Sequence, residues 1–183
     1  MNEPVPEPGP EEKPGSGKGS FTFTGSARTR VPDTGGRPQV YLHAGQLAVA
    51  PDPTAIVTVL GSCVSVCLWD PASRVGGVNH FLLPHHVERE RSPRFGNVAV
   101  PQLVDAVVRA GASRAGLVAK VFGGASVLGA MARARRLGEE NASLALHLLE
   151  EARIPVLDRD VGGERGRKLV FVSDEGTAWV KLL

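Results

Sequence analysis

Short apolar runs, each ended by glycine or proline, fill the chain from Gln39 to Leu183, and this pattern constrains the fold most. Enrichment in β-branched residues predicts strands in 40–50, 54–60, 63–70, 75–84, 117–122, 154–161, 168–173 and 177–183. Helical spacing of apolar residues occurs in 101–110, with Pro101 in the expected first turn, and in 138–154. Because strands outnumber helices and do not alternate strictly with them, an α+β fold with mixed sheets is favoured.

Residues 1–38 differ from the rest in composition. They hold seven of the 14 prolines and seven of the 22 glycines, and their charges cancel. Such a segment buries too little apolar surface to offset its ordering entropy, so we predict a disordered tail at 1–38 and one domain at 39–183. The alternating stretch Phe21-Thr22-Phe23-Thr24 is an exception, and it leaves an edge strand or a weak docking contact open.

Charge and hydropathy exclude several classes of protein. A net charge of +2 and an aromatic content of 5% supply neither a basic face nor stacking platforms, so we expect no nucleic-acid partner. The acidic, proline-rich start does not resemble a signal peptide, and no run reaches about 18 apolar residues. We therefore expect a cytoplasmic protein without membrane insertion.

The two cysteines lie in the segment Gly61-Ser62-Cys63 and, four positions later, at Cys67. On one strand their Cα atoms would be about 13 Å apart, too far for a disulfide, which tolerates about 7 Å. Gly61 and Ser62 favour a tight turn that exposes the Cys63 thiol and backbone N–H as a nucleophile and an oxyanion donor. Free cysteine also packs as a small apolar residue, and this alternative is strong for Cys67 and open for Cys63.

A hairpin of 63–70 and 75–84 would carry Cys63 on one arm and His80 on the other. His80 is then either the base that activates the thiol or a hydrogen-bonded structural histidine. The spacing of Cys63, Cys67 and His80, with the adjacent His85 and His86, does not match a tetrahedral zinc set. We expect no metal.

Six segments together resemble the CheD family of chemoreceptor glutamine deamidases, in order and spacing from about Gln39 to Leu183. They are GSCVSVCLWDP, VGGVNHFLLP, RFGNVAVPQLVDAVVRAGA, LVAKVFGGASVL, LGEENASLAL and DVGGERGRKLVF. The resemblance implies two packed sheets flanked by helices, similar to the catalytic domain of cytotoxic necrotising factor. It also implies conversion of glutamine to glutamate on the chemoreceptor cytoplasmic domain, without a cofactor, and binding of the phosphatase CheC.

By the same resemblance, Cys63 is the nucleophile and His80 is the histidine that exchanges protons during thioester chemistry. A threonine six residues before the cysteine completes the triad in the family, but here that position is Val57. Thr58 takes the role only if its strand slips or bulges; otherwise a main-chain carbonyl orients His80. Two other functions stay open: a non-catalytic chemotaxis adaptor, and a related Cys-His protease or transglutaminase.

Overall fold

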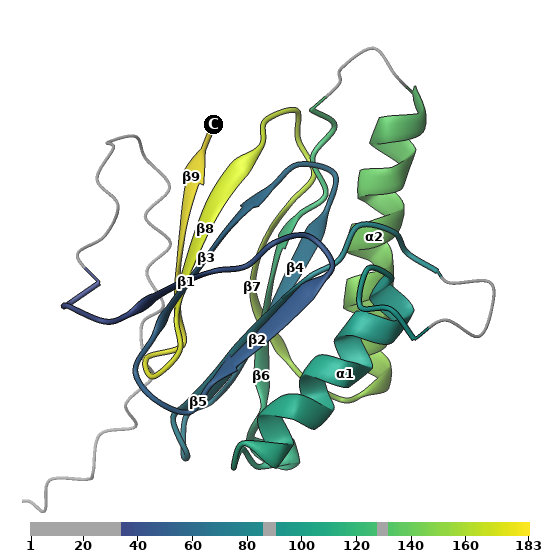
Figure 1. The fold of residues 1–183 in the computed structure, drawn as a ribbon. Coiled ribbons are helices and arrows are strands. Elements are labelled where there is room, and N and C mark those ends of the chain that lie inside the picture. Colours follow the sequence, from purple (N-terminus) through teal and green to yellow (C-terminus); the bar gives the residue numbers. More distant parts are fainter. Residues whose placement is uncertain (1–33, 86–90, 128–131) are drawn as a thin grey trace, which may run out of the picture.

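Two β-sheets and a pair of helices form three layers, with one sheet between the other sheet and the helices (Figure 1). The computed structural model describes residues 34–85, 91–127 and 132–183. The predicted tail lies largely outside this range. Residues 34–38 are described, and Arg37 forms an ion pair with Asp174, so the described chain makes tertiary contacts a few residues before position 39.

The first sheet has the strand order β1-β3-β8-β9 and the second has β2-β5-β4-β6-β7. The first sheet comprises β1 (Gln39–Tyr41), β3 (Ala55–Leu60), β8 (Arg167–Val172) and β9 (Thr177–Leu182). The second comprises β2 (Gln46–Ala50), β4 (Val64–Asp70), β5 (Val75–His80), β6 (Val118–Gly123) and β7 (Val156–Val161). The helices are α1 (Gly96–Arg109) and α2 (Ala132–Glu151), with a 3₁₀ turn, η1, at Arg114–Gly116.

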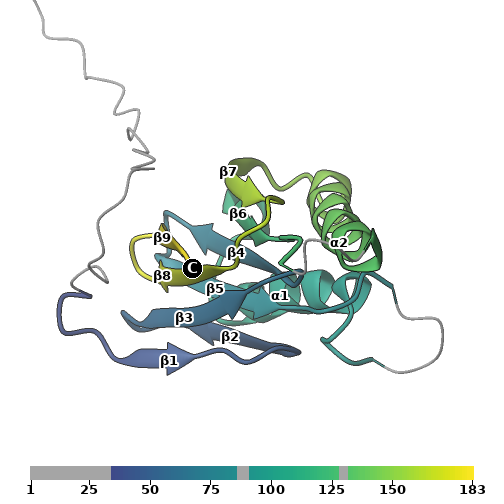
Figure 2. The same cartoon turned by 90° about the horizontal axis from the view of Figure 1, so that it is seen from above.

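Both sheets are mixed, because β1 pairs with β3 in parallel and β6 pairs with β7 in parallel, while the other pairs are antiparallel. The predicted α+β fold with two packed mixed sheets and flanking helices is confirmed. Both helices pack against the same sheet, which Figure 2 shows from above. The likeness to cytotoxic necrotising factor stays a prediction.

Strand β4 lies at the centre of the second sheet and is buried on both faces. Val64, Val66 and Leu68 pack in the cluster that includes the helices. Cys67 belongs to the cluster between the sheets, and Cys63 packs against it. The alternation along 63–70 therefore correctly separates the two faces, as a period of two requires.

Several details of the sequence prediction are wrong. The second helix, predicted at 138–154, spans Ala132–Glu151. The stretch 40–50 is two strands, because the chain turns at Gly45, whose φ of +81° suits glycine, and passes from one sheet to the other. Pro101 lies inside α1 and not in its first turn, because the helix begins at Gly96. The predicted end of that helix at Gly111 is confirmed, with a φ of +112° just beyond the last turn.

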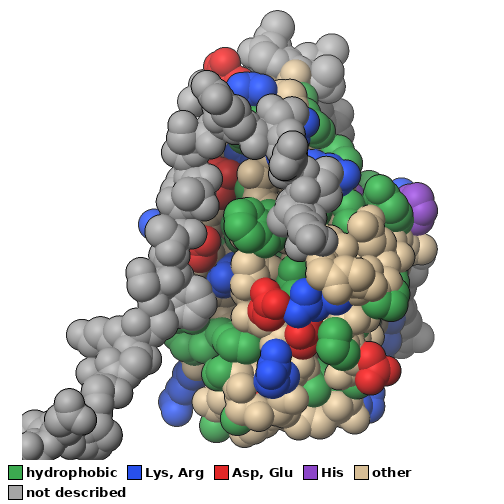
Figure 3. All heavy atoms as spheres, turned by 90° about the vertical axis from the view of Figure 1, so that its left-hand side faces the viewer, with side chains coloured by type: hydrophobic (Ala, Val, Ile, Leu, Met, Phe, Trp, Pro, Cys, Tyr) green, Lys and Arg blue, Asp and Glu red, His purple; other side chains and the backbone are tan. Residues whose placement is uncertain are grey.

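Acidic and basic side chains are interspersed on the face shown in Figure 3. This mixture agrees with the small net charge of the sequence. No helix in the described ranges is long and apolar enough to cross a membrane.

Candidate active site

The segment Gly61-Ser62-Cys63 carries the chain from β3 in the first sheet to β4 in the second. Each carbonyl oxygen of this turn accepts a hydrogen bond. The Gly61 oxygen accepts from the Ala125 N–H at 2.7 Å, and the Cys63 oxygen accepts from the Gly124 N–H at 2.8 Å. The Ser62 oxygen accepts from the Asn141 side chain at 3.0 Å. The backbone of the turn is thus fixed from one side.

Glycines allow the surrounding segments to approach this turn. A side chain at Gly123 would collide with the Cys63 carbonyl oxygen, and its φ of +115° also favours glycine. Gly124 and Gly138 on α2 meet backbone to backbone, so that a Cβ on either would clash with the carbonyl oxygen of the other. This contact brings Asn141, one helical turn after Gly138, to the Gly61-Ser62-Cys63 turn.

A buried arginine holds the Gly123–Gly124 segment in place. Arg167 is 3% exposed and donates to the carbonyl oxygens of Gly123 at 2.6 Å, Asp160 at 2.7 Å and Gly162 at 2.7 Å. Burial lowers its pKa, while the carboxylate of Asp160 opposes that shift. An arginine remains charged even so, and its planar set of donors suits several carbonyl oxygens at once.

The two cysteines have different surroundings. Cys67 is 1% exposed, and burial raises its pKa strongly, so its thiol stays protonated in the core. Cys63 is half-buried at the start of β4. Burial raises its pKa as well, and its own backbone N–H opposes the rise. The thiol at position 63 is the accessible one.

His80 ends β5 and is held by a chain of two hydrogen bonds. Its Nδ1 lies 2.8 Å from the Thr58 hydroxyl oxygen, and that hydroxyl donates to the Leu42 carbonyl oxygen at 2.8 Å. The single hydroxyl hydrogen is used on Leu42, so the hydroxyl oxygen accepts from Nδ1–H. The ring is therefore the Nδ1–H tautomer, and the lone pair is on Nε2.

The environment keeps this imidazole neutral. His80 is 5% exposed, and burial lowers its pKa, with a smaller lowering from the charge of His43 and an opposing effect from the Leu42 carbonyl. The Nε2 atom is buried without a hydrogen-bond partner among the described residues. A neutral imidazole with a free lone pair can take a proton.

Thr58 reaches His80 without the strand slip or bulge that we expected to be necessary. The register between β3 and β8 is continuous, from Ala55 opposite Val172 to Leu60 opposite Arg167. Thr58 faces the second sheet on this regular strand, as its contact with His80 requires, whereas Val57 belongs to a buried cluster with Ala55 and Val170. The expectation that a slip or bulge is needed was wrong because His80 lies in the other sheet. The sequence of the Thr58 strand does not specify where that sheet lies.

The hairpin places Cys63 and His80 near each other on the same face of the second sheet. Val64 pairs with Phe81, so the register sets His80 opposite Ser65 and one step diagonally from Cys63. Such diagonal neighbours are within reach of long side chains. Within the described ranges, Nε2 makes no hydrogen bond to the thiol, and the Ser65 hydroxyl is also buried without a partner. Catalytic hydrogen bonds are often formed only when substrate is present.

The other histidines are exposed or lie outside the described residues. His43, His85 and His147 are exposed, and His86 is outside the described residues. No group of three or more His, Cys, Asp or Glu side chains in the described part of the chain is arranged to hold a metal ion.

Sequence reasoning missed Asn141, which is fully buried and donates to the carbonyl oxygens of Ser62 at 3.0 Å and Leu82 at 2.8 Å. A signal was present. Asn141 lies within the stripe of α2 that also buries Gly138, Ala142, Ala145 and Leu149, and a polar residue in such a stripe requires partners. The sequence did not reveal what those partners are.

A solved structure offers only a distant likeness. The crystal structure of a Neisseria meningitidis protein of the family DUF152 has a TM-score of 0.39 and 11% identity, over 71% of this chain and 64% of that chain. At this level the likeness carries no argument.

Sequence relatives are much closer. A probable chemoreceptor glutamine deamidase CheD 1 of Anaeromyxobacter dehalogenans (strain 2CP-C) is 74% identical over 157 residues, which cover 86% of this chain and 92% of that protein. A probable chemoreceptor glutamine deamidase CheD of Sulfurimonas denitrificans is 44% identical over 143 residues, or 77% of this chain and 92% of that protein. The family model described as CheD chemotactic sensory transduction matches residues 82–182. The chain therefore belongs to the CheD family.

Proposed function

We propose that this protein hydrolyses the side-chain amide of selected glutamines on the cytoplasmic helices of chemoreceptors, giving glutamate. Cys63 is the nucleophile, His80 is the general base and acid, and Thr58 orients His80. The observation that carries the proposal is the hydrogen-bond chain from the Leu42 carbonyl through Thr58 to His80. It leaves the lone pair of Nε2 free on the sheet face that also carries the half-buried Cys63 thiol.

The first half of the reaction forms a thioester. The Cys63 pKa is raised and the His80 pKa is lowered, so the resting pair is a neutral thiol and a neutral imidazole. The sulfur attacks the glutamine side-chain carbonyl carbon while its proton passes to Nε2. The tetrahedral intermediate then collapses, its C–N bond breaks, and the proton on Nε2 passes to the leaving nitrogen. Ammonia is released and the acyl group stays on sulfur.

The second half hydrolyses the thioester. Water gives a proton to Nε2 as its oxygen attacks the thioester carbon. The C–S bond breaks, and the proton on Nε2 returns to the Cys63 sulfur. The net reaction is amide plus water to acid plus ammonia. This sequence of steps requires no metal and no organic cofactor.

Exposed apolar side chains beside the turn support a protein substrate. Val127 is 49% exposed, and its side chain lies against Gly61, while Leu83 is 39% exposed and follows the His80 strand. Such residues suit contact with the surface of a helix. We further propose a cytoplasmic location, where receptor signalling helices lie, and CheC as a partner that competes for this surface.

Mass spectrometry of a chemoreceptor cytoplasmic fragment tests the proposal. Incubation with the wild-type protein should add about one dalton for each amide converted to an acid, with release of ammonia. Cys63→Ala should give no conversion. Cys67→Ala is the matched control, and it should retain conversion per folded molecule because that thiol is enclosed in the core.

Other outcomes identify the alternatives. Receptor binding by the wild-type protein without any mass change would overturn the proposal and favour the adaptor. Peptide cleavage would indicate a protease, and incorporation of an added amine would indicate a transglutaminase. Conversion by Cys63→Ala would reject Cys63 as the nucleophile.

A further inference from the structure

We propose that Asn141 is a positioning residue that holds the Cys63 backbone N–H as an oxyanion donor. This inference rests on the proposed function and adds a part of the site that is contributed by α2. The side-chain amide of Asn141 donates both of its hydrogens, one to the carbonyl oxygen of Ser62 and one to that of Leu82.

The Ser62–Cys63 peptide bond links the Asn141 hydrogen bond to the direction of the Cys63 N–H. It is trans, since the described chain contains no cis peptide, so its C=O and N–H point in opposite directions. Asn141 draws the Ser62 oxygen towards α2. The Cys63 N–H must then point away from α2, and it belongs to the same residue as the sulfur.

This N–H is available for a ligand. Among the described residues it donates no hydrogen bond, whereas the three carbonyl oxygens of the turn are all occupied. A donor adjacent to the nucleophile meets the oxygen of a carbonyl that the sulfur attacks. Donors fixed in this way stabilise the charge that develops in the transition state.

The surroundings of Asn141 determine which end of its amide faces the turn. Both neighbours are carbonyl oxygens, so the nitrogen must point to them, and Oδ1 is left buried without a partner in the described part of the chain. A buried acceptor without a partner is unfavourable. We therefore infer that the role of Asn141 depends on the two hydrogen bonds that its side-chain nitrogen donates.

Two reactions of Cys63 distinguish positioning of the oxyanion donor by Asn141 from a contribution of Asn141 to the stability of the fold. Deamidation develops an oxyanion, but alkylation by iodoacetamide displaces iodide at a saturated carbon and develops none. Asn141→Leu has a similar shape and removes both donors. It should lower kcat by about 10- to 100-fold with KM little changed. Its alkylation rate should stay within about threefold of wild type.

Leu149→Ala is the matched control, because Leu149 is a fully buried residue on the same helix that takes no part in the turn. It should lower the melting temperature and leave both rates per folded molecule unchanged. Asn141→Asp supplies a second variant. Its buried carboxyl group between two carbonyl oxygens should stay protonated and donate one bond, so its kcat should lie between those of wild type and Asn141→Leu.

The outcomes are distinct. If deamidation and alkylation fall together in Asn141→Leu, or if kcat is unchanged, the inference is wrong while the proposed function stands. If the wild-type protein does not deamidate, the proposed function itself fails.

A measurement on the wild-type protein tests the inference even if the Asn141 variants do not fold. A receptor peptide carrying an aldehyde in place of the glutamine amide should add to Cys63 as a hemithioacetal, in which the sulfur bonds to carbon and the thiol proton moves to oxygen. The NMR signal of the Cys63 amide proton should then shift downfield as it donates to that oxygen. An unshifted signal would overturn the inference.

Discussion

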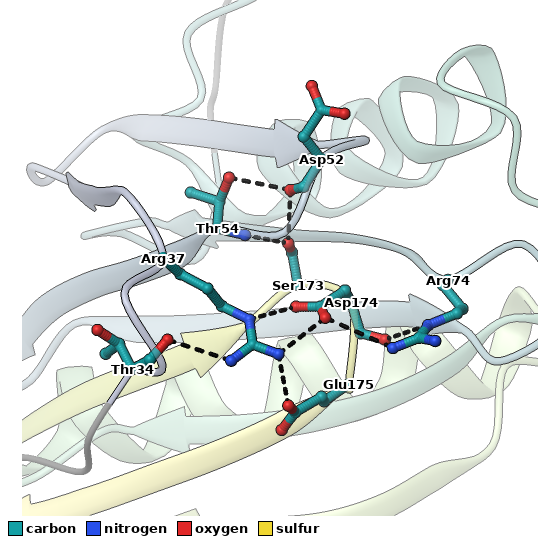
Figure 4. Close-up of polar contacts among 8 residues, drawn as sticks. All are labelled: Thr34, Arg37, Asp52, Thr54, Arg74, Ser173, Asp174 and Glu175. Carbon is teal, nitrogen blue, oxygen red and sulfur yellow. Dashed lines mark hydrogen bonds and ion pairs between the residues drawn. The ribbon is translucent and has the colours of Figure 1, made fainter.

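The two ends of strand β3 both carry buried polar groups, but the groups are paired differently. Before β3, Asp174 accepts from Arg37 at 2.8 and 2.9 Å, and a 3.5 Å contact joins it to Arg74 (Figure 4). Ser173 joins Thr54 and the Asp52 carbonyl in the same cluster. After β3, the site has buried atoms without partners among the described residues, among them His80 Nε2, Ser65 Oγ and Asn141 Oδ1.

We interpret the first as a structural cluster and the second as the candidate functional site. Hydrogen bonds from Arg37 lower the pKa of Asp174, so the charged form is favoured and the pair stabilises the fold. At the other end, unpaired groups lower stability and are retained where a ligand completes them. Substitutions at the Arg37 end should therefore change stability, and substitutions at the Cys63 end should change activity.

Apart from Cys63→Ala, the largest expected effect is the loss of activity in His80→Gln. Without a group that accepts and returns the proton, kcat/KM for deamidation should fall about a thousandfold, or about 4 kcal/mol in the barrier. The melting temperature should change little. His43→Gln, at an exposed neighbour, is the control and should keep activity at pH 7. A large loss of stability in His80→Gln would instead assign this histidine a structural role.

Asp174→Ala should have the second-largest effect, on stability. Asp174 is 7% exposed, and removing its carboxylate removes both hydrogen bonds from Arg37, so we expect about 1–3 kcal/mol less free energy of unfolding in urea. Activity per folded molecule should stay unchanged. Glu175→Gln is the control, and because Glu175 is exposed the change should be about 0–1 kcal/mol. Reduced turnover by folded Asp174→Ala would show that the two ends are coupled.

Thr58→Val should slow deamidation about 10- to 100-fold, or about 1.4–2.7 kcal/mol in the barrier. The valine lacks the oxygen that fixes the Nδ1–H tautomer of His80. Thr58→Ser keeps the hydroxyl and should retain most of the activity. Thr54→Val tests the same change at the other end of β3 and should leave turnover unaffected. Normal turnover in Thr58→Val would remove Thr58 from the site.

The smallest expected effect is the pH dependence that His80 gives to kcat/KM and to the free energy of unfolding. The pKa of His80 is lowered from its usual value of about 6.5, so kcat/KM should begin to fall only below that pH. Protonation is favoured more in the unfolded chain than in the folded one. His80 therefore makes the free energy of unfolding decrease as the pH falls from about 6.5 towards its folded pKa.

The charge of His43 contributes to the lowering, so His43→Gln should move the acid limb of the profile to higher pH by less than about one unit. His147→Gln, on the exposed face of α2, should not move it. A shift to lower pH in His43→Gln would contradict the sign of this interaction.

The sequence by itself determined the local structure and indicated Cys63 and His80 as candidate site residues. Alternation along 63–70 assigned the two faces of β4, and glycines and prolines marked most strand ends. The turn at Gly61 and Ser62 indicated Cys63, and hairpin geometry set His80 on the opposite arm. These inferences depend on residues close together in the chain, whose relative positions are set by strand and turn geometry.

Only the tertiary structure decided which sheet each strand joins, and hence what lies around His80. Periodicity reports the buried face of a strand but not its neighbours, so 40–50 was predicted as one strand although it divides between two sheets. The contact of Thr58 with His80 crosses from one sheet to the other, and Asn141 reaches Ser62 across 79 positions of sequence. Such contacts depend on packing of separate elements, which local sequence patterns do not encode.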